Sequence, residues 1–170
     1  VIHYRFLTRF KTNTHRAALD IWQAGLGITF QETQDSASAN FKITCVGSGT
    51  AWTPSMNLLS LTDTDTLGTC LHEVGHLLGI YHEQDRPDQR ATFYKLYAAN
   101  LAKDMFAEGK LRSEEDGETA SGFISRVSTS QEKLNLREWG DYDENSIMSY
   151  PGSKYLQKTS PSLGDFATAK

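Results

Sequence analysis

Hydrophobic and polar residues alternate at the start of the chain, where Ile2, Tyr4 and Phe6 share one face of "IHYRFL". This period of two predicts a strand. The segments "GITFQE" and "NFKITCV" have the short apolar patterns of further strands. Pro54 excludes the middle of a central strand, so "AWT" and "NLLSL" on its two sides are expected to form short or edge strands.

Two segments have apolar residues at helical spacing. The first, "TNTHRAALDIWQAGLG", begins with residues that can cap a helix and ends at Gly25 and Gly27. His15 lies in its first turn and is expected to be exposed. The second helix is predicted over residues 66–79, with Gly79 as its end. Its apolar face consists of Leu67, Leu71, Val74 and Leu78.

The pattern weakens after residue 88. "TFYKLYAANLAKDMFAEGK" has helical patches, "SEEDGETASG" is typical of an exposed acidic loop, and the tail "KTSPSLGDFATAK" predicts no element. A chain of 170 residues is the size of one domain. We therefore expect a single domain over residues 1–170, with an N-terminal lobe of strands and helices and an irregular second half.

Composition narrows the class of protein. The net charge is -4, and no long basic run favours nucleic acid. No window approaches the roughly 18 apolar residues of a membrane span, and the opening "VIHYRFLTRF" alternates too regularly for a signal peptide. The two cysteines, Cys45 and Cys70, either remain free thiols or close a loop of about 25 residues, which would contribute roughly 3 kcal/mol.

Candidate chemistry is concentrated in "TCLHEVGHLLGIYHEQDRPD", which holds three of the five histidines. On a helix His72 and His76 lie about 40° apart and one turn from each other, so both imidazoles can reach one metal ion. A straight helix would carry His82 away from that ion. Gly79 can adopt positive φ and turn the chain back, which aims His82 at the metal. Cys70 lies about 160° from His72 and is expected to face the interior or a disulfide partner.

Three histidines leave a fourth position open, as in catalytic zinc sites. Glu73, next to the first ligand, can take a proton from the attacking water and pass it to the leaving amine. The simpler interpretation of H-E-x-x-H alone is an amphipathic helix with two surface histidines. If a metal is bound, the types of ligand alone do not exclude a redox-active metal. The longer H-E-x-x-H-x-x-G-x-x-H spacing favours a hydrolytic zinc site.

This long motif resembles that of the metzincin metallopeptidases. "SIMSY" resembles their methionine turn, with Met148 beneath the metal, although a lone methionine is usually a core residue. Glu83 after the third histidine and Tyr150 in "SIMSY" resemble the astacin family. That resemblance implies that Tyr150 is a further zinc ligand that can swing to hydrogen-bond the oxyanion; without the motif it would be read as a packed aromatic.

The resemblance extends to "VIHYRF", to "GSGTAWT" as the edge strand that aligns substrate, and to "GDYDENSIMSY". Three departures stand out. "RPDQR" has Gln89 and Arg90 where the family usually has Arg-Asp. The family's contact between its amino terminus and the residue equivalent to Glu83 is not predicted for this sequence. The family's C-terminal helix and its cysteine are not evident. Cys45 and Cys70 could match the inner pair of the family's four cysteines.

The resemblance implies an α+β, metzincin-like catalytic domain. The N-terminal lobe, about residues 1–80, would hold a mixed twisted sheet and the active-site helix, and the C-terminal lobe, about 81–170, would be irregular with the methionine turn. It implies a secreted, monomeric zinc endopeptidase with one catalytic Zn²⁺ and protein or peptide substrates. The alternatives are a matrixin-like or pappalysin-like peptidase and a non-catalytic, zinc-stabilised binding module. Arg86 and Arg90 could favour acidic residues near the cleaved bond, but surface ion pairs are the commoner explanation for such arginines.

Overall fold

The computed structural model describes residues 1–8, 13–47, 49–83, 86, 140–149 and 158–169. The chain forms two compact units, of which the first comprises Val1–Tyr81, Asn145–Met148 and Tyr155–Lys170 and the second His82–Glu144 and Ser149–Lys154. The described helices and strands all belong to the first unit. The helical patches and acidic loop expected after residue 88, as well as Tyr150, Gln89 and Arg90, lie outside the described residues.

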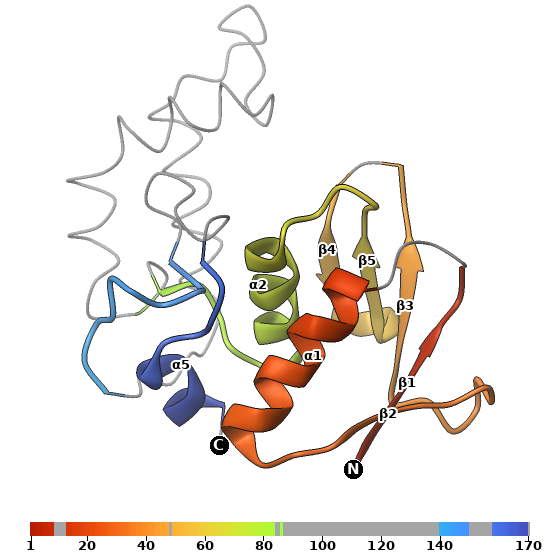
Figure 1. Ribbon diagram of the computed structural model, residues 1–170, viewed down its shortest axis with the longest axis horizontal. Coiled ribbons are helices and arrows are strands. Elements are labelled where there is room, and N and C mark those ends of the chain that lie inside the picture. The colour runs from red at the N-terminus through yellow and green to blue at the C-terminus, as the bar shows by residue number, and fades with distance from the viewer. Residues whose placement is uncertain (9–12, 48, 84–85, 87–139, 150–157, 170) are drawn as a thin grey trace, which may run out of the picture. The chain divides into compact units, whose positions relative to one another are not determined.

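The first unit contains a five-stranded sheet in the order β2-β1-β3-β5-β4 (Figure 1). The strands are β1 (Ile2–Phe6), β2 (Phe30–Glu32), β3 (Phe41–Cys45), β4 (Ala51–Thr53) and β5 (Leu58–Leu61). The first four in that order run parallel, and β4 alone pairs antiparallel with its neighbour. The mixed sheet and the edge position of "AWT" are confirmed. "NLLSL" forms the short strand that was expected, of four residues, but inside the sheet, because a 3-10 turn at Pro54–Met56 takes the proline out of the sheet.

Two helices lie side by side against the sheet (Figure 1): α1 (Asn13–Leu26) and α2 (Leu67–Leu77). Trp22 of α1 is fully buried, and its indole N–H donates to the carbonyl of Leu71 over 3.0 Å. This bond satisfies the polar edge of a large aromatic side chain inside the core. The core of the first unit also contains the buried apolar side chains Ala18, Leu19, Ile43, Leu59, Leu61 and Val74. The sheet and α1 thus hold α2 on its apolar face. Among the described residues, no helix combines the length and apolar character needed to cross a membrane.

The C-terminal tail contains a helix, α5 (Leu163–Thr168), so the expectation of a tail without an element was wrong. Ser162 caps it: its Oγ accepts from the backbone N–H of Asp165 at 3.0 Å, and its own N–H donates to the Asp165 carboxylate at 2.8 Å. This reciprocal capping box stabilises the start of a helix whose sequence has no helical pattern of hydrophobic residues. The Phe166 ring then packs edge-on against Trp22, with centroids 5.3 Å apart.

Gly25 and Gly27, both expected to end the first helix, have different roles. The helix continues through Gly25 and ends at Leu26, and Gly27 follows with a φ of 65°. A β-carbon at Gly25 would overlap the Phe166 ring. Glycine is therefore needed there for the close approach of α5, whereas Gly27 supplies the positive φ of the helix end.

The burial of His15 and of the two cysteines can be compared with what the sequence predicted. His15 is 3% exposed, so the expectation that it faces solvent was wrong: its side chain lies with Asp65 and Cys70, at the start of α2. Cys70 is buried, as its position on the helix predicted, and Cys45 is half-buried. Both are free thiols, so the disulfide alternative is not seen.

Candidate metal centre

Helix α2 presents His72 and His76 one turn apart. The helix begins at Thr66, whose Oγ1 accepts from the backbone N–H of Thr69 at 3.1 Å. From that fixed start, the spacing of four residues brings the two imidazole rings to a centroid distance of 4.7 Å. His72 is only 1% exposed. His76 is half-buried, so of the two imidazoles on α2 only that of His72 is largely protected from bulk water.

The chain turns sharply after α2. Gly79 has a φ of 88°, its N–H donates to the carbonyl of His76 at 3.0 Å, and the N–H of Ile80 donates to the carbonyl of Gly75, also at 3.0 Å. This pair of bonds is the Schellman arrangement, which requires a residue with positive φ just past the helix. The predicted helix end at Gly79 is confirmed, and His82 follows three residues later.

Gly79→Ala should lower both the stability and the metal affinity. A side chain at positive φ costs roughly 1–2 kcal/mol, and the strained turn would also misplace His82. Gly27→Ala is the matched control, because Gly27 also has positive φ and open space around it but precedes no ligand. Thermal unfolding should show similar losses for both variants. Zinc titration should show weaker binding only for Gly79→Ala, and equal affinities in the two variants would contradict this role.

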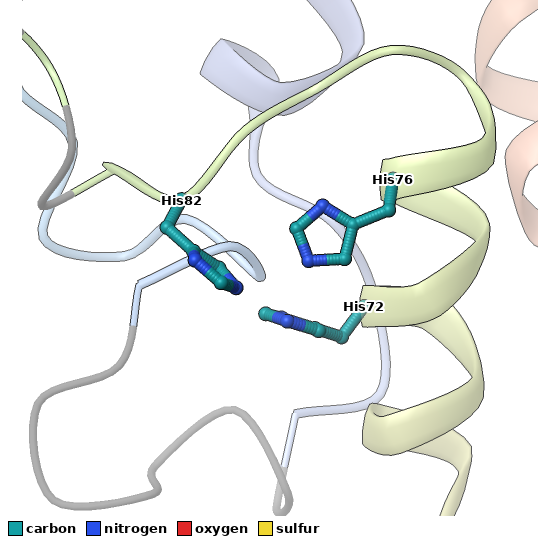
Figure 2. Close-up of side chains that lie close together, drawn as sticks. All are labelled: His72, His76 and His82. Carbon is teal, nitrogen blue, oxygen red and sulfur yellow. The ribbon is translucent and has the colours of Figure 1, made fainter. Parts of the chain in front are cut away.

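His72, His76 and His82 can together hold a metal ion. Each offers a ring nitrogen, and these atoms all lie within 4.8 Å of one another. Figure 2 shows the three rings turned toward a common point. Three neutral nitrogen donors suit Zn²⁺, which binds imidazoles in a tetrahedral arrangement. The three predicted ligands are thus brought together.

Hydrogen bonds to carbonyl groups fix which nitrogen of two histidines faces the metal. Nδ1 of His72 lies 2.9 Å from the carbonyl oxygen of Ile147, and Nδ1 of His76 lies 2.8 Å from that of Ile80. A carbonyl oxygen only accepts, so each Nδ1 carries the proton and each Nε2 is the nitrogen with the lone pair. Such outer bonds orient metal-binding histidines. The donors present therefore fit a zinc ion.

Glu73 is 8% exposed, which is unusual for a carboxylate. It follows the first histidine on α2 and belongs to the same buried turn of the helix. Near a bound dication, its negative charge would be partly compensated. The structure thus places a buried carboxyl group directly after the first histidine of the cluster.

A buried turn at Ser146, Ile147 and Met148 lies next to His72 and is hydrogen-bonded to it. The Asp165 carboxylate of α5 accepts from Ser146 Oγ at 2.5 Å and from the N–H of Ile147 at 2.8 Å. The N–H of Met148 donates to Ser146 Oγ at 2.9 Å. Because the Ile147 carbonyl accepts from His72, a chain of hydrogen bonds links α5 to the first metal ligand. The sequence interpretation missed Asp165; the S-x-x-D spacing after Pro161 was the available signal.

Met148 packs directly against α2 at Gly75. A β-carbon on Gly75 would overlap the Met148 sulfur and lie 3.5 Å from the Trp22 ring. Met148 is fully buried, so its side chain has little space to move. Glycine in the middle of the metal-binding helix therefore allows the methionine turn to approach its backbone.

Gly75→Ala should destabilise the protein, because overpacking costs about 1–3 kcal/mol and outweighs the helix propensity of about 1 kcal/mol gained by alanine. In a Met148→Ala background the same change should be neutral or stabilising, since the opposing side chain is gone. Chemical unfolding of the four proteins in this double-mutant cycle measures the coupling. An effect of Gly75→Ala that is the same in both backgrounds would show that Met148 does not restrict the site.

Glu83 is held within the second unit. Its carboxylate accepts from the N–H of Asp143 at 2.8 Å and lies 3.7 Å from the Arg86 guanidinium. Arg86 also donates to the carbonyl of Gly140 at 2.7 Å. Both charged side chains are mostly buried. Arg86 thus forms an ion pair, as one of the two sequence interpretations expected, but the pair is mostly buried and not at the surface.

A sequence model described as "Astacin", which represents a family of peptidases, matches residues 1–163. The chain belongs to the astacin family. This confirms the resemblance read from the zinc motif and the methionine turn, and it removes the alternative of a matrixin-like or pappalysin-like branch. The α+β fold expected of an astacin-family chain is confirmed, and the family's use of zinc agrees with the three convergent histidines.

Solved structures support the same fold. Myroilysin matches with a TM-score of 0.60 and 18% identity, over 99% of this chain and 89% of that chain. High choriolytic enzyme 1, a hatching enzyme zinc-protease from Oryzias latipes, matches with a TM-score of 0.58 and 16% identity, over 99% of this chain and 86% of the other. Zinc metalloproteinase nas-36 of Brugia malayi is 32% identical over 75 residues, which span 42% of this chain and 13% of that protein.

Proposed function

We propose that this astacin-family chain is a zinc-dependent endopeptidase that hydrolyses peptide bonds in proteins. The observation that supports it most directly is the convergence of three histidine nitrogens within 4.8 Å, with two of the Nδ1 atoms hydrogen-bonded to carbonyl groups. Zinc held there by His72, His76 and His82 would act as a Lewis acid on the substrate carbonyl and acidify the attacking water. A fourth position is left for chemistry.

Glu73 is the proposed general base. Its low exposure and its place directly after His72 support this role. The carboxylate would accept the proton of the attacking water and then donate it to the nitrogen of the departing amine, which cannot leave as an anion. A single side chain thus serves both proton transfers.

Tyr150 and Met148 have proposed roles that follow from family membership. Tyr150 lies outside the described residues; the family pattern "S-x-M-x-Y" supports it as a further zinc ligand and as a hydrogen-bond donor to the oxyanion. Met148 is proposed as the base of the metal site, a role supported by its complete burial and its packing on Gly75.

An extended peptide is the proposed form of the substrate. Among the described strands, β4 (Ala51–Thr53) ends the sheet and pairs only with β5. An edge strand has unpaired backbone groups that an extended peptide can join by hydrogen bonds. Recognition through the backbone suits an endopeptidase that cleaves within long chains.

We further propose, on the basis of the family, that the protein acts as a secreted monomer. A free thiol outside the cell is exposed to oxidation, but Cys70 is protected in two ways. It is completely buried, and burial, together with the negative charges of Asp65 and Glu73, raises its pKa to about 12. In the metal-free protein the thiol therefore stays protonated and slow to react.

The remaining alternative is a zinc-stabilised binding module without activity. The test is cleavage of a diverse peptide mixture, read by mass spectrometry, with and without a chelator. We expect chelator-sensitive cuts inside the peptides that return when zinc is restored. A folded, zinc-loaded protein that cuts none of them would favour the binding module, and cuts that persist without metal would contradict zinc catalysis.

A further inference from the structure

A second group of metal-binding side chains lies apart from the three histidines. His15, Asp65 and Cys70 each offer one ligand atom, and these atoms all lie within 4.8 Å of one another. Among the described residues, this is the only other such group that contains histidine or cysteine. We propose that His15, Asp65 and Cys70 bind a second divalent metal ion, best matched by Zn²⁺, that joins the start of α1 to the start of α2.

The fold brings these residues together from three places in the chain. His15 is in the first turn of α1, Asp65 immediately precedes the cap residue of α2, and Cys70 is in the first turns of α2. The packing of α1 against α2, with the Trp22–Leu71 bond of 3.0 Å, fixes the distance between the two helices. The three donors therefore converge as a property of the fold.

The donors match zinc in kind and in charge. Zn²⁺ accepts imidazole nitrogen, thiolate sulfur and carboxylate oxygen, whereas Mg²⁺ and Ca²⁺ prefer oxygen alone. His15 and Cys70 are 3% and 0% exposed. One neutral imidazole, one carboxylate and one thiolate carry two negative charges, which offset the two positive charges of the ion. The loaded cluster would be neutral overall, which limits the cost of burying charge.

Asp65 is already oriented by its neighbours. Thr50 Oγ1 lies 2.9 Å from both carboxylate oxygens, Thr62 Oγ1 donates over 2.8 Å, and the N–H of Thr62 donates over 2.6 Å. These four contacts come from only three donor protons, because Thr50 has a single hydroxyl proton to share between the two oxygens. Such outer hydrogen bonds are typical of metal-binding carboxylates.

The consequence for the protein is structural. A metal held by α1 and by both sides of the α2 cap would fix the start of the helix whose next turn contains His72. Loss of this ion should lower the unfolding temperature while leaving the all-histidine site able to bind its own ion. The inference does not depend on peptidase activity, because it rests on different side chains.

Cobalt binding tests the proposal. Co²⁺ bound to a thiolate gives a sulfur-to-metal charge-transfer absorption, whereas the three-histidine site contains no sulfur. We expect the metal-free full chain to bind two equivalents of Co²⁺ and to show this absorption. Cys70→Ser should bind only one equivalent of Co²⁺ and should not show the charge-transfer absorption. Cys45→Ser, which removes the other, half-buried thiol, should retain both equivalents and the absorption.

His15→Gln tests the site with both thiols in place, in case Cys70→Ser does not fold. We expect His15→Gln to lower the affinity for the second Co²⁺ ion by more than roughly 10–100-fold, which is the loss caused by removing a residue that only hydrogen-bonds to a metal ligand. One equivalent without charge transfer in the unsubstituted protein would overturn the proposal. So would an absorption that persists in Cys70→Ser or that disappears in Cys45→Ser. Because metal content and absorption are the readouts, these results are independent of whether the protein cleaves peptides.

Discussion

Glu73→Gln should lower the rate of peptide hydrolysis by about 10²–10⁴-fold, the usual contribution of a positioned general base. Glutamine has nearly the same shape but cannot take a proton from water at neutral pH. The three histidines and their carbonyl partners are unchanged, so zinc binding should persist. The loss should appear in kcat more than in KM, because the proton transfer occurs in the transition state.

The measurement is steady-state cleavage of a peptide identified from the mixture, with zinc content determined on the same samples. Glu32→Gln is the matched control: Glu32 is on β2 and pairs with Arg16 at 2.6 Å, far along the chain from the metal ligands. It should retain the full rate. A zinc-loaded Glu73→Gln protein with unchanged kcat would show that another group carries the proton.

The metal ligands could be predicted from sequence because their arrangement is local. His72 and His76 are set by the helical period, and Gly79 marks the helix end through its backbone freedom. The short strands were visible in the alternation, but their order β2-β1-β3-β5-β4 depends on long-range pairing that no short pattern contains.

The missed features depend on contacts between distant segments. His15 was expected to be exposed because it begins a helix with a polar first turn, and only the packing of α1 on α2 explains its burial. α5 was missed because six residues are too few for a hydrophobic period. Its capping box is a local signal, but the burial of Asp165 against the methionine turn is a tertiary property.

Asp165→Ala should be among the most destabilising changes in the chain. The carboxylate is 3% exposed and accepts from Ser146 Oγ, from the N–H of Ile147 and from the N–H of Ser162. Alanine would remove the acceptor of two buried donors, Ser146 Oγ and the N–H of Ile147, and of the part-buried N–H of Ser162. Each such loss costs about 1–3 kcal/mol, and we expect a total of roughly 3–5 kcal/mol, a large part of the stability of a typical domain. Thermal and chemical unfolding measure it.

Two variants separate the charge from the hydrogen bonds. In Asp165→Asn the amide oxygen can still accept from the two backbone N–H groups, and the amide nitrogen can donate to Ser146 Oγ. The loss should then be clearly smaller than for alanine. Asp20→Ala removes an exposed carboxylate from α1 and should change stability little. Equal losses for Asp165→Ala and Asp165→Asn would indicate that charge, not the pattern of acceptors, determines the effect.

Asp165→Ala should also weaken zinc binding, because Asp165 acts on His72 through the methionine turn. Asp165 fixes Ile147 through its N–H, and the carbonyl of Ile147 fixes Nδ1 of His72 at 2.9 Å. Outer partners of metal ligands typically contribute 10–100-fold in affinity, on the order of 1–3 kcal/mol. Zinc titration of the folded variant, under conditions where unfolding is negligible, isolates this effect from stability. Unchanged affinity in a folded Asp165→Ala protein would limit Asp165 to holding α5 in place. A weakened affinity would show that α5, although distant in sequence from every ligand, helps to orient the metal ligand His72.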